Sequence, residues 1–394
     1  MSTDFKAVSK CDDAPTSLPV IAFCIEELSV GGAEQMLVVL ANEFVMRGWQ
    51  VHMVCLTQAG ELASLLDESV QLHVMNKRSG IDPGLPGRLK RCIDEIKPDV
   101  INSHLWVANA WTRLSLLTRD IPVVVTEHSR DTWKPSYYRW IDKQLARKTY
   151  RLVAVSHDTA NFYEKSIGVH KEKIDVINNG VDTVRYANGC GKALRDQWLG
   201  SADNEGRSFL VGTVGRLVTA KNHQRLIDAV HLLVNDNEVT RQSDVHLYIV
   251  GEGPERSSIE QHISELGVGA SVSLMGARQD VPDVLAAFDV FVLSSDREGH
   301  PLTALEAQAA GTPVVLTDAG GSQDAIARLG DETGGELVSL DAKALSEAIK
   351  RMIIDPSLRE KRARFARQFA LENFDKQRMV DRYEALFRSS FSHS

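Results

Sequence analysis

The stretch "SSDREGHPLTALEAQAAGTPVV", residues 294–315, predicts a helix that leads into a buried strand. Pro301 suits the first helical turn, because the N–H that proline lacks would be unpaired there. Apolar side chains then recur at helical spacing, at Leu302, Leu305 and Ala309. Gly311 predicts the end of this helix, just before the apolar run that follows it.

Two glutamates accompany this helix. Glu298, followed by Gly299, lies in the loop before the helix start, and Glu306 lies within the helix. A helix N-terminus attracts anions such as phosphate. A carboxylate in the same loop therefore needs another role, and recognition of hydroxyl groups is an obvious one.

The alternation of short apolar runs with helical patterns extends outward along most of the chain. One series of β-like runs comprises "VIAFCI", "VHMVCLT", "VQLHVM", "VINSH", "VVVTEH" and "RLVAVS". A second series comprises "FLVGTVGR", "VHLYIVGEG", "VSLMGA", "VFVLSS" and "TPVVLTD". Strands that alternate with helices predict a parallel α/β sheet in each series.

A chain of 394 residues is long enough for two domains, each with its own core. Residues 183–209 interrupt the alternation of strands and helices, because they are rich in glycine, asparagine and charged residues, and they indicate a linker. We predict an α/β fold of two Rossmann-like, doubly wound domains that face a central cleft. Its parts are a disordered N-terminal tail (1–17), an N-terminal domain (18–185), a linker (186–208) and a C-terminal domain (209–373).

Composition narrows the class of protein. The net charge of −8 gives no support to nucleic-acid binding. The five cysteines are dispersed without a C-x-x-C pair, which indicates reduced thiols. The polar N-terminus has no apolar core of a signal peptide, and no stretch approaches the ~18 apolar residues of a membrane span. We therefore expect a soluble cytoplasmic protein.

Metal chemistry finds little support in the sequence. There is no H-E-x-x-H motif, no cysteine cluster and no pair of aspartates two residues apart. A G-x-S-x-G nucleophile motif is also missing. We expect no metal and no cofactor.

Ligands of doubly wound sheets bind beyond the carboxyl ends of the strands, so the loops there deserve inspection. In "SVGGAEQ", Gly31 and Gly32 would let the backbone come close to a ligand at a helix start. The alternative is an ordinary tight turn between strand and helix. In "TVGRLVTAKNH", Arg216 and Lys221 precede a helix that begins near Asn222. They form a plausible diphosphate clamp, and the alternative is a pair of solvated cations.

Two histidines end successive predicted strands of the first series. His104 ends "VINSH" and His128 ends "VVVTEH", which puts both at the cleft. A histidine there could donate a hydrogen bond to a phosphate or a sugar hydroxyl. Either one alone is more often a structural histidine with its hydrogen bonds satisfied.

Taken together, "GGAE", "GRLVTAKN" and "EGHPLTALE" on two Rossmann-like domains resemble the retaining glycosyltransferases of family 4, which have the GT-B fold. The resemblance covers nearly the whole chain from about Val20 and includes "VINNGVD" (176–182). Residues 374–390 look like the family's C-terminal helix, which packs back on the N-terminal domain. Glu298 and Glu306 match the family's E-x7-E motif.

The resemblance implies a role for each of these residues in binding a nucleotide-sugar donor. Glu298 would hold hydroxyls of the donor sugar, and Glu306 the ribose hydroxyls. Arg216 and Lys221 would bind the diphosphate and neutralise its charge as it leaves. Gly32 and the backbone amides around Leu302 and Thr303 would complete the phosphate site. Gly31 and Gly299 would be further donor-binding residues.

His128 matches the family's cleft histidine better than His104 does, and the family implies a catalytic role for it. His300 departs from the family, in which this position is commonly apolar or aromatic. The resemblance also implies retention through front-side attack, in which an oxygen of the donor phosphate accepts the acceptor's proton.

The resulting hypothesis is a cytoplasmic, metal-independent, retaining glycosyltransferase. It would move a sugar from a UDP- or GDP-sugar to a lipid-linked saccharide in surface polysaccharide biosynthesis. One alternative is a nucleotide-sugar epimerase on the same fold, which would need no acceptor. Another is a non-catalytic nucleotide-sugar sensor, which would not hydrolyse the donor.

Residues 133–151 suggest where such an enzyme works, because they are strongly basic and aromatic. On a helix, Arg139, Lys143 and Arg147 form one stripe, and Trp140 lies on the same side. A second stripe, expected to pack on the sheet, comprises Tyr137, Ile141 and Leu145. Basic residues with interfacial aromatics are attracted to anionic membranes, so we expect docking on the inner face of the plasma membrane. The alternative is a solvated helix face.

Overall fold

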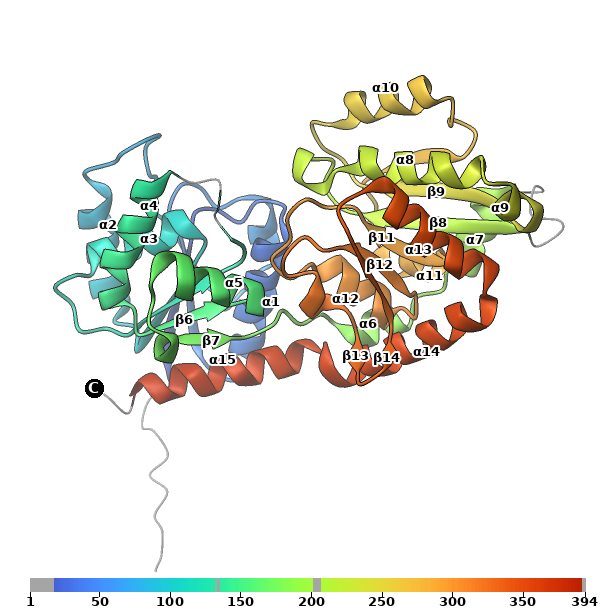
Figure 1. Cartoon of the computed structure of the whole chain (residues 1–394). Coiled ribbons are helices and arrows are strands. Elements are labelled where there is room, and N and C mark those ends of the chain that lie inside the picture. The colour runs from blue at the N-terminus through green and yellow to red at the C-terminus, as the bar shows by residue number, and fades with distance from the viewer. Residues whose placement is uncertain (1–17, 131, 133–134, 201–206, 392–394) are drawn as a thin grey trace, which may run out of the picture.

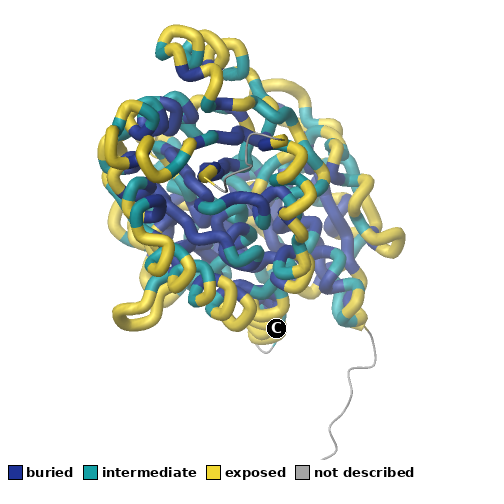
Figure 2. The backbone as a smooth tube through the Cα atoms, turned by 90° about the vertical axis from the view of Figure 1, so that its right-hand side faces the viewer, coloured by how far each residue is buried: buried dark blue, intermediate teal, exposed yellow. Residues whose placement is uncertain are grey.

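The computed structural model describes residues 18–391 except 131, 133–134 and 201–206. The predicted tail (1–17) and Trp133 therefore lie outside the described residues. Two lobes stand side by side, each built on one parallel sheet with helices around it (Figure 1). Figure 2 shows the buried backbone in the interior of the molecule and the exposed segments around its edge.

The first lobe holds a seven-stranded sheet in the order β3-β2-β1-β4-β5-β6-β7, and all its strands are parallel. The strands are β1 (Val20–Ile25), β2 (Gln50–Cys55), β3 (Gln71–Val74), β4 (Val100–His104), β5 (Val123–Glu127), β6 (Arg151–Ala154) and β7 (Ile174–Val176). The helices are α1 (Gly32–Met46), α2 (Leu85–Ile96), α3 (Trp106–Ser115), α4 (Ser136–Leu145) and α5 (His157–Phe162).

The second lobe holds a six-stranded parallel sheet in the order β10-β9-β8-β11-β12-β15. The strands are β8 (Ser208–Val214), β9 (Asp244–Val250), β10 (Val272–Gly276), β11 (Val290–Leu293), β12 (Val314–Thr317) and β15 (Gly335–Val338). The helices are α8 (His223–Val234), α9 (Asn237–Gln242), α10 (Arg256–Leu266), α11 (Val281–Ala287), α12 (Leu302–Ala309), α13 (Ala342–Ile354) and α14 (Pro356–Asn373). A small hairpin of β13 (Arg328–Leu329) and β14 (Glu332–Thr333) stands apart from this sheet. The prediction of two Rossmann-like α/β domains is confirmed.

The segment predicted as a linker is more ordered than expected. Two helices, α6 (Thr183–Ala187) and α7 (Lys192–Leu199), lie in or beside it. Tyr186 and Leu199 are buried in the core of the second lobe, and Trp198 stacks on Tyr248 there. The described part of 186–208 therefore packs with the second domain, because its apolar side chains belong to one of the cores of that domain.

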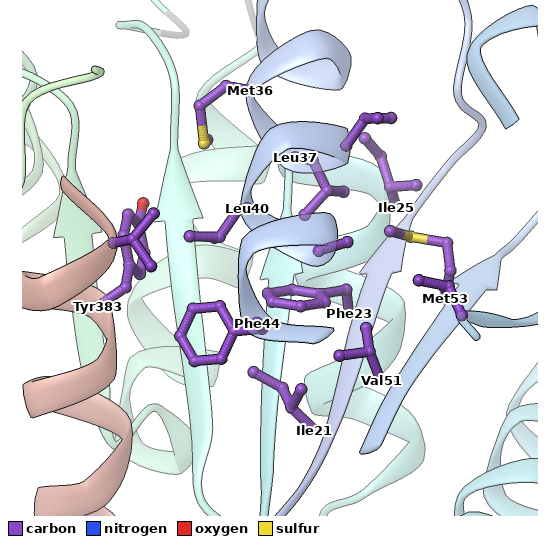
Figure 3. Packing of buried hydrophobic residues seen from close by; sticks show 14 of the residues in the cluster. Ile21, Phe23, Ile25, Met36, Leu37, Leu40, Phe44, Val51, Met53 and Tyr383 are labelled. Carbon is purple, nitrogen blue, oxygen red and sulfur yellow. The ribbon is translucent and has the colours of Figure 1, made fainter. Parts of the chain in front are cut away.

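The last helix, α15 (Lys376–Phe391), returns to the first lobe and runs along it (Figure 1). Its buried face belongs to the core of that lobe and comprises Met379, Val380, Tyr383 and Phe387. Figure 3 shows Tyr383 pointing toward α1, on the side where Leu40 and Phe44 lie. The ring of Phe387 lies 5.4 Å from that of Phe44, so the end of the chain completes the hydrophobic core formed by its beginning.

The strand orders place a reversal point in each sheet. In the first sheet the neighbours of β1 are β2 and β4, and in the second the neighbours of β8 are β9 and β11. The loops that leave two such neighbouring strands diverge to opposite faces, which opens a crevice for a ligand. The loops after β1, β4, β8 and β11 therefore frame the candidate site.

We expect Phe387→Ala to destabilise the protein by about 3–5 kcal/mol, because it leaves a cavity in the core of the first lobe. Chemical denaturation followed by tryptophan fluorescence measures the loss. Met46→Ala is the matched control, since Met46 is 69% exposed and its truncation should change the stability by less than about 0.5 kcal/mol. A loss below about 1 kcal/mol for Phe387→Ala would show that α15 is only loosely docked.

Candidate active site

Lys221 and Glu298 meet at the reversal point of the second sheet. Lys221 Nζ lies 2.6 Å from Glu298 Oε1, and Ser295 Oγ donates to the same oxygen at 2.6 Å. The second carboxylate oxygen, Oε2, has no hydrogen-bond partner among the described residues. The arrangement holds a largely buried carboxylate, neutralises it, and leaves one oxygen able to accept from a substrate hydroxyl.

Backbone hydrogen bonds fix both loops. The N–H of Glu298 donates to Ala319 O at 2.7 Å, and Gly321 N–H donates to Glu298 O at 2.9 Å. On the other loop, Asn222 caps α8 by accepting from the N–H of Arg225. Ser294 Oγ lies within 3.1 Å of the carbonyl oxygens of Lys221 and Asn222, which ties the β8 loop to the end of β11.

A cavity of about 220 Å³ opens beside Glu298 between the two lobes. The first lobe contributes Ser129 and Arg130, and the second contributes Ala220, Arg297, Glu298 and Ala319. Arg130 Nε is paired with Asp158 Oδ2 at 2.8 Å. The cavity is thus lined by cations and one carboxylate, which suits a polar, negatively charged substrate.

The two lobes meet through backbone at Gly299. A Cβ on this residue would lie 1.6 Å from the carbonyl oxygen of His128, and a Cβ on Gly321 would lie 1.4 Å from Gly299 O. Only glycine permits either approach. Nearby, the N–H of His157 donates to Asp324 across the same junction at 2.6 Å. The end of β5 is therefore held against the loop that carries Glu298.

Both predicted histidines lie at the ends of their strands, but they differ in exposure. His104 is fully buried and its Nδ1 lies 3.1 Å from Nε2 of the partly exposed His128. Burial lowers the pKa of His128 to about 4 and that of His104 well below its usual value. Both rings are neutral at physiological pH, and of the two only His128 is partly exposed.

Arg216 faces the first lobe. Burial raises the pKa of Glu34, and the positive charge of Arg216 counteracts that rise. The carboxylate of Glu34 folds back over Gly31 at the start of α1, since a Cβ on Gly31 would lie 2.2 Å from Glu34 Oε2. Gly32 is exposed, and a Cβ there would contact Leu302 at 3.7 Å. The N-termini of α1 and α12 thus lie close together, with Thr303 as the next residue of α12.

Glu306 lies further along α12 and contacts a different set of residues. Burial raises its pKa to about 7, and a hydrogen bond from the Tyr186 hydroxyl and the charge of Arg185 oppose that rise. Sequence reasoning missed Tyr186, because it lies in the segment interpreted as a linker. The two glutamates of the motif are therefore held by separate partners, Lys221 for one and Tyr186 for the other.

His300 is not part of the cavity lining. Its ring is buried and Nε2 lies 3.3 Å from Asp324 O, while its own carbonyl accepts from Asn179 at 2.9 Å. Burial lowers the pKa of His300 to about 4. The histidine therefore replaces the apolar side chain common in the family as a neutral, packed ring at the junction of the lobes.

Helix α4 differs from its prediction. Tyr137, expected to pack on the sheet, is 57% exposed, while the next residue, Tyr138, packs on Trp106 instead. Arg139, expected on the basic stripe, turns inward, with its guanidinium 5.9 Å from the centre of the Phe162 ring. The contact face is thus shifted by one residue at the start of the helix, whereas Leu145 at its end is buried as predicted. The exposed side chains include Tyr137, Trp140 and Lys143 on the helix and Arg147 in the turn after it.

The part of the chain that the structure describes contains no group of three or more histidine, cysteine, aspartate or glutamate side chains arranged to hold a metal ion. None of its helices is long and apolar enough to cross a membrane.

The two Rossmann-like domains around this site form the GT-B fold. The family description Glycosyltransferase Family 4 matches residues 30–185, and Glycosyl transferases group 1 matches residues 195–369. The chain belongs to glycosyltransferase family 4, and the predictions of family, fold and enzyme class are confirmed.

Curated relatives include bacterial glycosyltransferases. The UDP-Gal:α-D-GlcNAc-diphosphoundecaprenol α-1,3-galactosyltransferase of Escherichia coli is 27% identical over 79% of this chain and 81% of that protein. The lipopolysaccharide core biosynthesis glycosyltransferase LpsE of Rhizobium meliloti is 33% identical over 46% of this chain and 50% of that protein.

Solved structures share the fold over nearly the whole chain. Anabaena Alr3699/HepE in complex with UDP superimposes with a TM-score of 0.80 at 22% identity, covering 94% of this chain and 99% of that one. A glycosyltransferase from Rickettsia africae gives a TM-score of 0.80 at 17% identity, covering 95% and 100%.

We expect Gly299→Ala to lower sugar transfer by about 10²-fold, because the new methyl group forces the loops of the two lobes apart by about 1 Å. The control is Gly87→Ala in α2, where an added Cβ meets nothing within 4 Å and the transfer rate should stay unchanged. Steady-state kinetics of folded variants measure both rates. Wild-type turnover in Gly299→Ala would mean that this close approach is not needed for activity.

Proposed function

We propose that this glycosyltransferase moves a sugar from a UDP- or GDP-sugar to a lipid-linked saccharide, with retention of the anomeric configuration and without a metal. The observation that supports it most is the Lys221–Glu298 contact beside the cavity at the reversal point of the second sheet. The E. coli relative, whose name gives UDP-Gal as donor and a diphosphoundecaprenol-linked sugar as acceptor, supports a nucleotide-sugar donor and a lipid-linked acceptor. The proposed pathway is surface polysaccharide biosynthesis.

The energetic problem of the reaction is the departing nucleotide diphosphate, whose negative charge grows as the glycosidic bond breaks. Lys221 and Arg216 supply positive charge at the start of α8, and the N-termini of α1 and α12 add their dipoles. Glu298 keeps one oxygen for a hydroxyl of the donor sugar. His128 lies on the opposite side of the junction, next to Ser129 of the cavity.

A transfer assay tests the proposal. The purified protein is incubated with UDP- and GDP-sugars and a synthetic polyprenyl-diphosphate-linked sugar, and the product is analysed by NMR. We expect one new glycosidic bond with the anomeric configuration of the donor. An inverted product would refute retention, and conversion of the donor to an epimer without transfer would favour the epimerase alternative.

Substitution of Glu298 and of Glu306 should impair different properties of the enzyme. Glu298→Gln should mainly reduce turnover, because this carboxylate meets the sugar, whereas Glu306→Gln should weaken nucleoside diphosphate binding by roughly 1.5–3 kcal/mol through a lost charged acceptor for the ribose. Calorimetry with the nucleoside diphosphate separates the two effects. Equal loss of affinity in both variants would refute this division.

Glu306 also predicts a pH dependence. Its raised pKa of about 7 means that the group is largely protonated below that pH and ionised above it. Ribose hydroxyls donate more strongly to the carboxylate, so nucleoside diphosphate affinity should rise as the pH increases from 6 to 8. The phosphate of the ligand also ionises in this range, so Glu306→Gln is the control. Identical pH profiles for the variant and the wild type would contradict the assignment.

We also propose that the exposed face of α4 and the turn after it docks on an anionic membrane. Trp140 is 65% exposed and Tyr137 57%, and the exposed cations Lys143 and Arg147 lie nearby in sequence. Exposed aromatics with cations bind an anionic lipid surface, at about 1 kcal/mol per cation. A lipid-linked acceptor would require the enzyme to work at such a surface.

Sedimentation with anionic phospholipid vesicles tests the docking. Binding should decrease with rising salt, and it should decrease by about tenfold or more in Lys143→Glu/Arg147→Glu. Lys361→Glu/Arg364→Glu on α14 makes the same change in charge on exposed residues of the other lobe and should bind like the wild type. Absence of wild-type binding at low salt would show that this face is merely solvated.

A further inference from the structure

A chain of buried polar side chains lies behind His128 and ends at its ring. Asn102 Oδ1 lies 2.7 Å from His104 Nε2, and His104 Nδ1 lies 3.1 Å from His128 Nε2. Asn102 and His104 are both completely buried. We call these three residues the histidine relay. Buried polar groups form such contacts only when each donor faces an acceptor.

One backbone carbonyl sets the direction of every bond in the histidine relay. The Asn102 amide lies 3.2 Å from Val124 O, which can only accept, so the group that faces it is the NH₂ group. The carbonyl oxygen of the same amide therefore faces His104. Because that oxygen accepts, His104 Nε2 must carry the hydrogen.

Because His104 is neutral, the direction of its hydrogen bond to Asn102 also determines the direction of its hydrogen bond to His128. A neutral imidazole with its hydrogen on Nε2 has a lone pair on Nδ1. That lone pair faces His128, so His128 Nε2 must carry a hydrogen and donate it. Since His128 is also neutral at physiological pH, its own Nδ1 is left without a hydrogen.

The bare nitrogen lies on the side of the ring away from His104. His128 is partly exposed while His104 is not, and Ser129, the next residue, lines the cavity beside Glu298. Among the described residues, His128 Nδ1 has no hydrogen-bond partner. The position that sequence reasoning treated as a donor toward phosphate or hydroxyl is thus an acceptor.

We propose that Asn102 and His104 are positioning residues that hold His128 as a hydrogen-bond acceptor, which selects a substrate hydroxyl over a carboxylate. This specificity rests on the proposed function, because it requires the sugar to occupy the cavity. A hydroxyl can donate to the bare Nδ1. An anionic oxygen at the same place has no hydrogen to donate, so its lone pairs would face the lone pair of Nδ1 and the two would repel each other.

The ring hydrogens are observed directly by ¹⁵N-edited NMR of the full-length protein, with the signals of His128 assigned from their loss in His128→Gln. We expect a hydrogen on Nε2 and none on Nδ1. Thr126→Val is the matched control, because Thr126 Oγ1 also accepts from Asn102 at 3.0 Å but does not set the direction of the amide. The tautomer should be unchanged in Thr126→Val, and a hydrogen on Nδ1 of wild-type His128 would overturn the inference.

Steady-state kinetics test whether the histidine relay affects turnover and the choice between a hydroxyl and a carboxylate. In His104→Leu the acceptor for His128 is removed, and turnover should fall by about tenfold or more with nucleoside diphosphate affinity unchanged. His104→Asn, which restores an acceptor oxygen, should recover most of the rate. The wild type should prefer a neutral nucleotide sugar over the matching uronate by about tenfold or more, and His104→Leu should narrow that preference.

Equal use of neutral and uronate donors by the wild type would overturn the selection step. The NMR measurement needs no substrate, so it separates this inference from the proposed function. A protein with the expected tautomer but no sugar transfer refutes the proposed function, whereas active protein with the opposite tautomer refutes the histidine relay.

Discussion

The contact between the backbone of Gly299 and the carbonyl of His128 is the constraint on which the site depends. Without a Cβ at Gly299 or Gly321, three loops from two separate sheets come close enough for main-chain contact. This junction places a strand end of the first lobe beside the loop of Glu298. The crossover of α15, whose aromatic side chains complete the first core, adds a second tie between the lobes and keeps that geometry defined.

Three cations at this junction face carboxylates before any substrate arrives. Lys221 is paired with Glu298, Arg130 with Asp158, and the charge of Arg216 acts on Glu34. Unpaired cations in a cleft that is partly shielded from water would repel one another. A diphosphate can instead take over contacts that the carboxylates hold in the free enzyme. In the proposed function, the same cations would serve both the stability of the free site and the chemistry of the bound one.

Much of this was predictable from the sequence, because hydrophobic runs such as Val20–Ile25 and Val100–His104 mark strands and their ends mark the cleft. The edge strands β7 and β15 were missed, since Asp175 interrupts the first and Gly335 and Glu336 leave the second without a continuous apolar run. Tyr186 and the histidine relay were missed because they depend on pairings between distant segments. At the start of α4 the contact face was predicted one residue out of phase, since Tyr137 and Tyr138 fit the helical period equally well, whereas Leu145 is buried as predicted.

We propose that side chains of this protein, in place of a metal, stabilise the leaving diphosphate. The most direct measurement is turnover of the nucleotide sugar by wild type and Lys221→Ala, each with and without excess EDTA. The account predicts wild-type turnover unaffected by the chelator and a loss of about two to three orders of magnitude in Lys221→Ala. Loss of wild-type activity in EDTA, restored by added divalent cation, would contradict it.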